Sequence, residues 1–195
     1  MRVPLSAFPR RPVIHLPLLT DIDFLQDRIL HSQPRSHTSQ LLNLYGHALQ
    51  SLLPSPPLKI YTDGSCSNVG QPNARSGSGV FFGNLLHPLN TTARVTGKQT
   101  NNRGELLAVL IAIQKSHSKR RVEIYSDSEY AIRSIVYRAP KEAQSNWSCT
   151  NGDILHAICL WIASREAPII FHHVRGHSNN AHNDAADNLA NIGSS

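Results

Sequence analysis

After residue 57 the sequence shows an order of apolar patterns that few folds can accommodate. Three strand-like runs come first, LKIYTD (58–63), SGSGVFFG (76–83) and TTARVTG (91–97), and they are joined by short turns. Strands joined in this way pair antiparallel, whereas strands separated by a helix pair parallel. Helical and strand-like patterns then alternate, at 103–117, 121–127, 128–137, 152–166, 167–174 and 182–193. The sequence therefore predicts an α/β fold with a mixed five-stranded sheet, three strands of it antiparallel, flanked by helices.

A proline-rich stretch, LLPSPPLKI at 52–60, divides the chain into two parts. Such composition is typical of a linker. The segments 21–30 and 39–53, which precede it, have the apolar spacing of helices. We therefore expect residues 1–57 to form a helical appendage with a proline-rich linker, of unknown function, and residues 58–195 to form the main domain.

Composition narrows the classes of partner. The net charge of +6 favours an acidic partner such as nucleic acid, and no apolar run approaches the ~20 residues of a membrane helix. An odd number of cysteines, three, argues against a disulfide framework and indicates an intracellular protein, nuclear or cytoplasmic. Arg2, Arg10 and Arg11 without a nearby acid leave mitochondrial targeting as an alternative, although four prolines interrupt any amphipathic helix there.

Four carboxylates fall at the ends of predicted elements. Asp63 follows the first strand and Asp127 the fourth, Glu105 lies in the first turn of the first helix, and Asp187 lies in the last helix. Because adjacent parallel strands end at the same edge of a sheet, Asp63 and Asp127 are expected to meet there. Taken singly, each acid fits a helix cap or a surface position better than a functional one.

Carboxylates that converge at one buried edge repel each other, and burial raises their pKa values. Two divalent cations, ~4 Å apart, would cancel this repulsion and create a site for phosphodiester hydrolysis. Oxygen ligands without cysteine favour Mg²⁺, or Mn²⁺, over zinc.

Four motifs together resemble cellular-type ribonuclease H: YTDGSC, TNNRGELLAV, IYSDSEY and HVRGHSNNAHNDAADNLA, in this order. The resemblance covers about Leu58 to Ile192. It implies a ribonuclease H-like fold and an endonuclease that hydrolyses the RNA strand of RNA–DNA hybrids by two-metal-ion catalysis, leaving 3′-hydroxyl and 5′-phosphate ends. The family's catalytic positions fall on Asp63, Glu105, Asp127, His177 and Asp187; the four acids match its metal ligands, and the histidine its mobile proton shuttle.

The resemblance also implies how the hybrid is recognised. The family contacts 2′-hydroxyls, which distinguish RNA from DNA, through small polar groups and backbone amides. The matching positions are Gly64, Ser65, Cys66, Asn101, Asn102, Ser128 and Asn183. We expect a monomer that needs no small-molecule cofactor beyond the metal and does not bind membranes.

The segment 138–151 departs from the family pattern. Many relatives carry a basic protrusion there, but this segment has only Arg138 and Lys141 as cations, against Glu142. Weaker affinity for the hybrid follows from this composition. Two alternatives remain: a catalytically weak nucleic-acid-binding module of the same fold, which the intact acids disfavour, and a three-acid nuclease such as an integrase, which the fourth acid disfavours.

Overall fold

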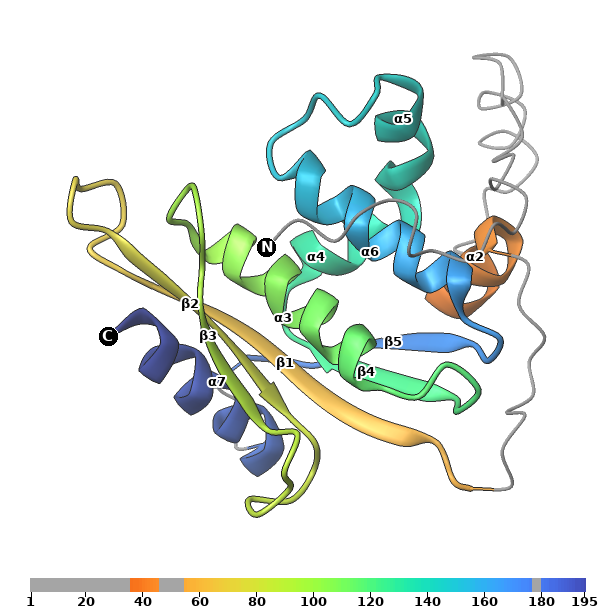
Figure 1. The fold of residues 1–195 in the computed structure, drawn as a ribbon, viewed down its shortest axis with the longest axis horizontal. Coiled ribbons are helices and arrows are strands. Elements are labelled where there is room, and N and C mark those ends of the chain that lie inside the picture. The colour runs from red at the N-terminus through yellow and green to blue at the C-terminus, as the bar shows by residue number, and fades with distance from the viewer. Residues whose placement is uncertain (1–35, 46–54, 177–179) are drawn as a thin grey trace.

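A computed structural model describes residues 36–45, 55–176 and 180–195 of the chain. Its centre is a five-stranded mixed sheet with the strand order β3-β2-β1-β4-β5 (Figure 1). The pairs β1–β2 and β2–β3 are antiparallel, while β1–β4 and β4–β5 are parallel, which confirms the predicted topology. The strands are β1 (Leu58–Ser67), β2 (Arg75–Phe81), β3 (Thr91–Arg94), β4 (Val122–Ser126) and β5 (Ile169–His173).

Helices cover both faces of the sheet, because side chains along each strand alternate between two apolar clusters. Ile60 joins the main core with α3 and α6, whereas the next residue, Tyr61, joins a small cluster beneath α7. The helical elements of the main domain are α3 (Asn101–Lys115), α4 (Glu129–Arg133), the π-helical turn η2 (Ser134–Arg138), α5 (Ala139–Gln144), α6 (Gly152–Ser164) and α7 (Ala181–Ser194). Helix α5 lies between the patterns at 128–137 and 152–166, where the sequence predicted no element.

Two helices lie directly on the backbone of the sheet. A Cβ atom placed at Gly79 of β2 would lie 2.0 Å from the carbonyl oxygen of Ala186 in α7. A Cβ at Gly64 of β1 would lie 2.3 Å from the backbone nitrogen of Glu105 in α3. Real side chains do not fit at such distances, so glycine at these positions lets both helices approach the sheet closely. The two contacts fix how far α3 and α7 stand from β1 and β2.

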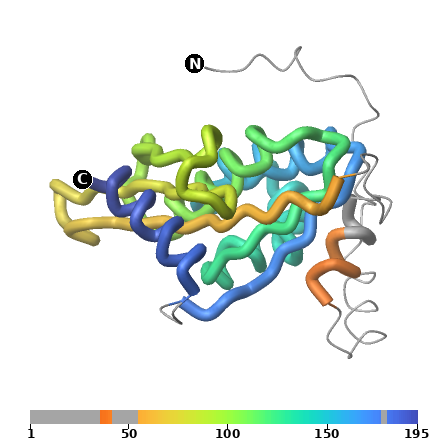
Figure 2. Tube along the Cα trace, turned by 90° about the horizontal axis from the view of Figure 1, so that it is seen from below, coloured from red at the N-terminus to blue at the C-terminus, as the bar shows by residue number. Residues whose placement is uncertain are grey.

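Helix α2 (His37–Tyr45) packs against the main domain at the β5 side, at the opposite end of the molecule from α7 (Figures 1 and 2). It begins two residues before the predicted start, because Ser36 Oγ accepts a hydrogen bond from Ser39 N at 3.2 Å and caps the helix. Leu41 is 4 % exposed and belongs to the main core, and His37 Nδ1 lies 2.9 Å from Tyr137 Oη. The helix predicted at 21–30 lies outside the described residues.

Among the described elements no helix combines the length and the apolar character that crossing a bilayer requires. The three cysteines, which all lie within the described ranges, form no disulfide bond.

Candidate active site

Asp63 lies within β1, on the part of the strand that pairs with β2 but not with β4. The parallel pairing of β1 with β4 ends at Thr62 opposite Ser126, but its antiparallel pairing with β2 continues to Ser67. The predicted position of Asp63 at the end of the strand is therefore wrong, because the hairpin partner β2 keeps β1 extended for four further residues. Asp127 directly follows β4, as predicted. It lies beside the residues of β1 that extend beyond the end of β4.

Glu105 reaches the same place from α3. The helix begins at Asn101, and the Thr100 side chain caps it by accepting a hydrogen bond from Arg103 N at 3.3 Å. Glu105 consequently lies in the second turn, and the predicted first-turn position is wrong, because the helix starts two residues earlier than its apolar pattern. The close approach of α3 to Gly64 holds the Glu105 backbone against β1.

The three carboxylates form one cluster. Oxygen atoms of Asp63, Glu105 and Asp127 all lie within 4.8 Å of one another. Burial and the charge of Asp127 raise the pKa of Asp63 to about 7. Burial, followed by the charge of Asp63, raises the pKa of Glu105 well above its usual value. In the absence of a cation the cluster therefore favours protonated carboxyl groups, and a nearby cation would favour the ionised form.

Asp187 lines the same cleft from α7. The cleft has a volume of about 260 Å³ and is lined almost entirely by polar groups of β1, α3, α7 and the residue after β4. Asn191 Nδ2 donates a hydrogen bond of 3.1 Å to Asp187 Oδ1. Asp184 also lines the cleft, although it is not among the site residues predicted from the sequence. Its spacing of three residues from Asp187 in a helix was the available signal, since this spacing puts both on one face.

The predicted hybrid-binding residues divide into two groups. Those that line the cleft are Gly64, Ser65, Cys66, Asn101 and Asn183. The described lining does not include Asn102, which is exposed on the first turn of α3, or Ser128, whose hydroxyl caps α4 by accepting from Ala131 N at 3.2 Å. His177 lies outside the described residues.

The chemistry of the site fits a hard divalent cation. Glu105 Oε2 and Asn183 Oδ1 are buried without a hydrogen-bond partner among the described groups. A buried oxygen without a partner is costly, and coordination of a cation would remove that cost. The Cys66 thiol, the only sulfur in the described lining, donates to the Gln99 carbonyl at 3.6 Å. Oxygen ligands of this kind suit Mg²⁺ or Mn²⁺.

The comparison with protein families agrees with this geometry. The model of the ribonuclease H family matches residues 55–195, which include all four acids. The chain belongs to the ribonuclease H family. It is 35 % identical over 144 residues to the ribonuclease H of Orientia tsutsugamushi, and this covers 70 % of the chain and 82 % of the relative. It is 32 % identical over 165 residues to human ribonuclease H1, and this covers 75 % of the chain but 57 % of the human protein.

Solved structures confirm the fold. LC9-RNase H1, described as a type 1 RNase H with the type 2 active-site motif, superposes with a TM-score of 0.55 and 24 % identity over 73 % of this chain and 74 % of that one. A foamy viral protease–reverse transcriptase, solved in complex with dsDNA, superposes with a TM-score of 0.59 and 25 % identity over 73 % of this chain and 98 % of that one. The chain is a ribonuclease H, a metal-dependent endonuclease of the RNA strand in RNA–DNA hybrids.

Proposed function

We propose that Asp63, Glu105, Asp127 and Asp187 hold two divalent metal ions, Mg²⁺ in the cell with Mn²⁺ as a substitute, and that these residues carry the hydrolysis. The observation that supports this assignment is the approach of three carboxylates to within 4.8 Å of one another, two of them with raised pKa values. Without a compensating charge, burial and mutual repulsion in such a cluster favour the protonated carboxyl groups.

When bound, two such ions supply the charge that activates water and stabilises the leaving oxygen. The chain's own groups hold the acids in position beforehand. Gly64 N donates to Asp63 Oδ1 at 2.7 Å, Asn183 Nδ2 to Asp127 Oδ2 at 3.4 Å, and Asn191 Nδ2 to Asp187 Oδ1 at 3.1 Å. Ligands fixed in this way need little reorganisation when substrate arrives.

Recognition of the RNA strand is proposed to use the polar groups beside the acids. Asn101 and Ser65, together with the backbone around Gly64, line the cleft next to Asp63 and Glu105 and are suited to contact 2′-hydroxyls. Cleavage between the acids leaves 3′-hydroxyl and 5′-phosphate ends. For His177 we propose that it either shuttles a proton or helps the product leave, supported by its position in the family motif of the sequence.

We also propose that the enzyme acts as a monomer inside the cell, in the nucleus or cytoplasm, with mitochondria as the alternative compartment. Three cysteines that form no disulfide bond are consistent with a reducing compartment. Light scattering coupled to gel filtration tests the monomer, and a fluorescent fusion expressed in the source cell tests the compartment.

The direct test is cleavage of an RNA–DNA hybrid labelled on the RNA strand, with Mg²⁺ or Mn²⁺. We expect cleavage of the hybrid and none of double-stranded DNA. Asp63→Asn and Glu105→Gln should each lose on the order of 10³-fold in rate, equivalent to ~4 kcal/mol of transition-state stabilisation. Glu129→Gln, which neutralises an exposed acid paired with Arg133 at 3.0 Å, is the matched control and should cleave normally.

Two results would contradict this assignment. A folded wild-type protein that binds the hybrid but leaves it intact with either metal would be a nucleic-acid-binding module. Normal cleavage by Asp63→Asn would mean that the site is assigned to the wrong residues.

A further inference from the structure

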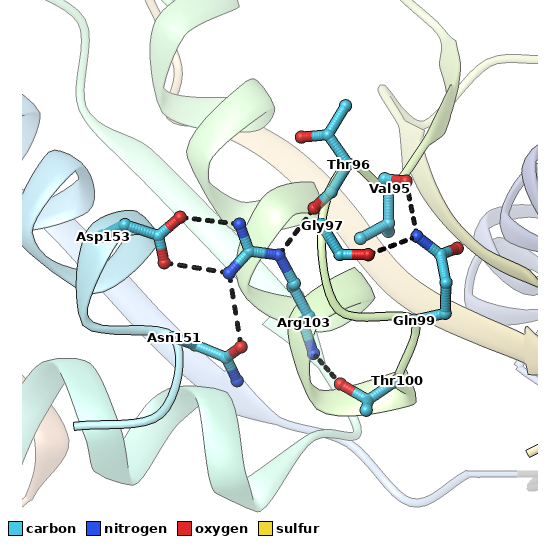
Figure 3. A network of polar contacts seen from close by, with 8 residues as sticks. All are labelled: Val95, Thr96, Gly97, Gln99, Thr100, Arg103, Asn151 and Asp153. Carbon is cyan, nitrogen blue, oxygen red and sulfur yellow. Dashed lines mark hydrogen bonds and ion pairs between the residues drawn. The ribbon is translucent and has the colours of Figure 1, made fainter. Parts of the chain in front are cut away.

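A second polar network lies behind the first turn of α3, and its centre is Arg103 (Figure 3). The guanidinium forms a two-pronged ion pair with Asp153 at the start of α6, with N–O distances of 2.8 and 2.6 Å. Its Nε donates to the carbonyl oxygen of Thr96 at 2.8 Å. The Arg103 side chain is only 11 % exposed, whereas the Asp153 side chain is 64 % exposed, so the guanidinium is enclosed while water reaches the carboxylate. Charge-assisted, bidentate pairs of this kind are the most directional that side chains make.

The network continues from Arg103 to a third helix. Asn151 Oδ1 accepts from Arg103 Nη1 at 3.4 Å, and Asn151 Nδ2 donates to Tyr130 Oη in α4 at 3.2 Å. Asn151 is 7 % exposed and has the left-handed backbone conformation, with φ of 65°. The starts of α3, α4 and α6 are thereby connected through Arg103 and Asn151.

The loop before α3 is fastened to β2 on the other side of Arg103. Gln99 Nε2 donates to the carbonyl oxygens of Val95 and Gly97 at 3.0 and 2.8 Å (Figure 3), and its Oε1 accepts from Ser76 N at 2.7 Å. The loop that leads into α3 is therefore closed on itself and fixed to the sheet. Arg103 fixes its far side through Thr96.

Arg103 belongs to the helical turn that carries Asn101, a residue of the cleft, but does not itself line the cleft. Asn101 lines the cleft and Asn102 is exposed on the same turn, but Arg103 is not among the described lining residues. Glu105, one turn later, has a separate support. A Cβ at Gly104 would lie 2.6 Å from the Gly77 carbonyl oxygen, so the backbone beside Glu105 rests on the sheet without help from Arg103.

We propose that Arg103, held by Asp153, is a positioning residue that keeps the first turn of α3 in place for the RNA strand and so sets the affinity for the hybrid. The inference rests on the proposed function of Asn101 as a contact to 2′-hydroxyls. Hydrogen bonds lose most of their strength when donor and acceptor shift by a fraction of an ångström. Loss of the ion pair therefore weakens binding, while the separately held acids keep the rate at saturation.

The test compares Arg103→Met with Arg133→Met, which removes an equal charge from an exposed arginine of α4 whose pair with Glu129 is solvent-exposed. Hybrid affinity is measured by fluorescence anisotropy in EDTA, where the bound hybrid stays intact, and KM and kcat are measured with Mg²⁺. We expect Arg103→Met to weaken binding and raise KM about tenfold, the effect of losing one well-placed hydrogen bond to substrate, with kcat within about twofold. The control should change KM less than about twofold.

The salt dependence separates positioning from direct contact. An arginine that neutralises a phosphate contributes about one unit to the slope of log K against log salt, whereas a positioning residue contributes none. We expect Arg103→Met to bind more weakly with an unchanged slope. A slope that falls by about one unit would overturn the inference in favour of a direct phosphate contact.

Asp153→Asn provides a second variant if Arg103→Met does not fold. It keeps the shape and one hydrogen bond but removes the charge, and should weaken binding about threefold with kcat unchanged. In the double variant Arg103→Met/Asp153→Asn, affinity should equal that of Arg103→Met alone, because both changes break the same pair. Unchanged affinity in the folded single variants, or a lower kcat at unchanged KM, would overturn the inference. A wild-type protein that neither binds nor cleaves the hybrid would instead refute the proposed function.

Discussion

The acidic cluster should make Asp63→Asn more stable than the wild-type protein when metal is absent. The substitution keeps the size and shape of the side chain, but removes one of three carboxylates whose oxygens lie within 4.8 Å of one another. Asp63 is 7 % exposed, so water screens its repulsion poorly. The variant would then be more stable but much less active, a trade-off that is common at active sites.

The magnitude follows from the pKa. The pKa of Asp63 rises from 3.8 to about 7, a difference that corresponds to ~4 kcal/mol at pH values above 7. Two unit charges 4.8 Å apart at an effective dielectric constant of 20 repel by ~3.5 kcal/mol, which agrees in scale. Between pH 4 and 7 the folded protein keeps a proton that the unfolded chain has released, so stability falls as the pH rises through this window.

Urea denaturation in EDTA, followed by circular dichroism at pH 5 and pH 8, measures the effect. At pH 8 we expect Asp63→Asn to gain ~2–4 kcal/mol, a midpoint shift of ~1 M or more, and at pH 5 much less. Asp184→Asn, an exposed acid of the same cleft, is the control and should gain little. Equal midpoints for Asp63→Asn and wild type at pH 8, or an equal gain for the control, would refute the reasoning. Saturating Mg²⁺ should reduce the difference, because wild type binds the ion.

The remaining predictions concern stability and affinity for the hybrid. Leu41→Ala should lower the free energy of unfolding by ~2–3 kcal/mol in urea denaturation, because this leucine is buried in the main core. A protein that consists of residues 58–195 alone should nevertheless cleave the hybrid. Gln144→Lys with Ser145→Lys should tighten hybrid binding and steepen its salt slope by up to ~2 units, with kcat unchanged; an unchanged slope would exclude this segment from the interface. Gly79→Ala should lower the free energy of unfolding by ~3 kcal/mol and reduce cleavage, because the new Cβ would push α7, and Asp187 with it, away from the sheet. An unchanged melting temperature of this variant would contradict the close approach of α7 to Gly79.

Local patterns were sufficient for the existence of the five strands, for α3, α4, α6 and α7, and for Asp127. The residue follows a short apolar strand flanked by helices, and nothing outside that stretch changes where the strand stops. Asp63 shows the limit of such patterns. Its strand continues because β2 pairs with it, and the partner lies about a dozen residues away, behind a turn that a reading of β1 alone does not include. Register between strands is a property of two segments, so one segment does not determine it.

The supports of the site were harder to predict than the acids. Arg103 and Asp153 are fifty residues apart, and nothing in either neighbourhood marks them as partners. Leu41 stands before the proline-rich linker and was assigned to an appendage, yet it packs into the main core. Gly77 and Gly79 did carry a signal: two glycines at alternate positions of a strand share one face, and this indicates a backbone that approaches that face.

The glycine contacts of α3 and α7 have a consequence for how this enzyme can be engineered and how it can diverge. Where helices are spaced by side chains, each change of core volume shifts them. Here the spacing at Gly64 and Gly79 is set by main chain against main chain, which does not change with the sequence of the core. Val109 and Ile158 are both buried in the main core. Libraries that vary these residues can therefore be selected for heat resistance while the distances between the site acids stay the same.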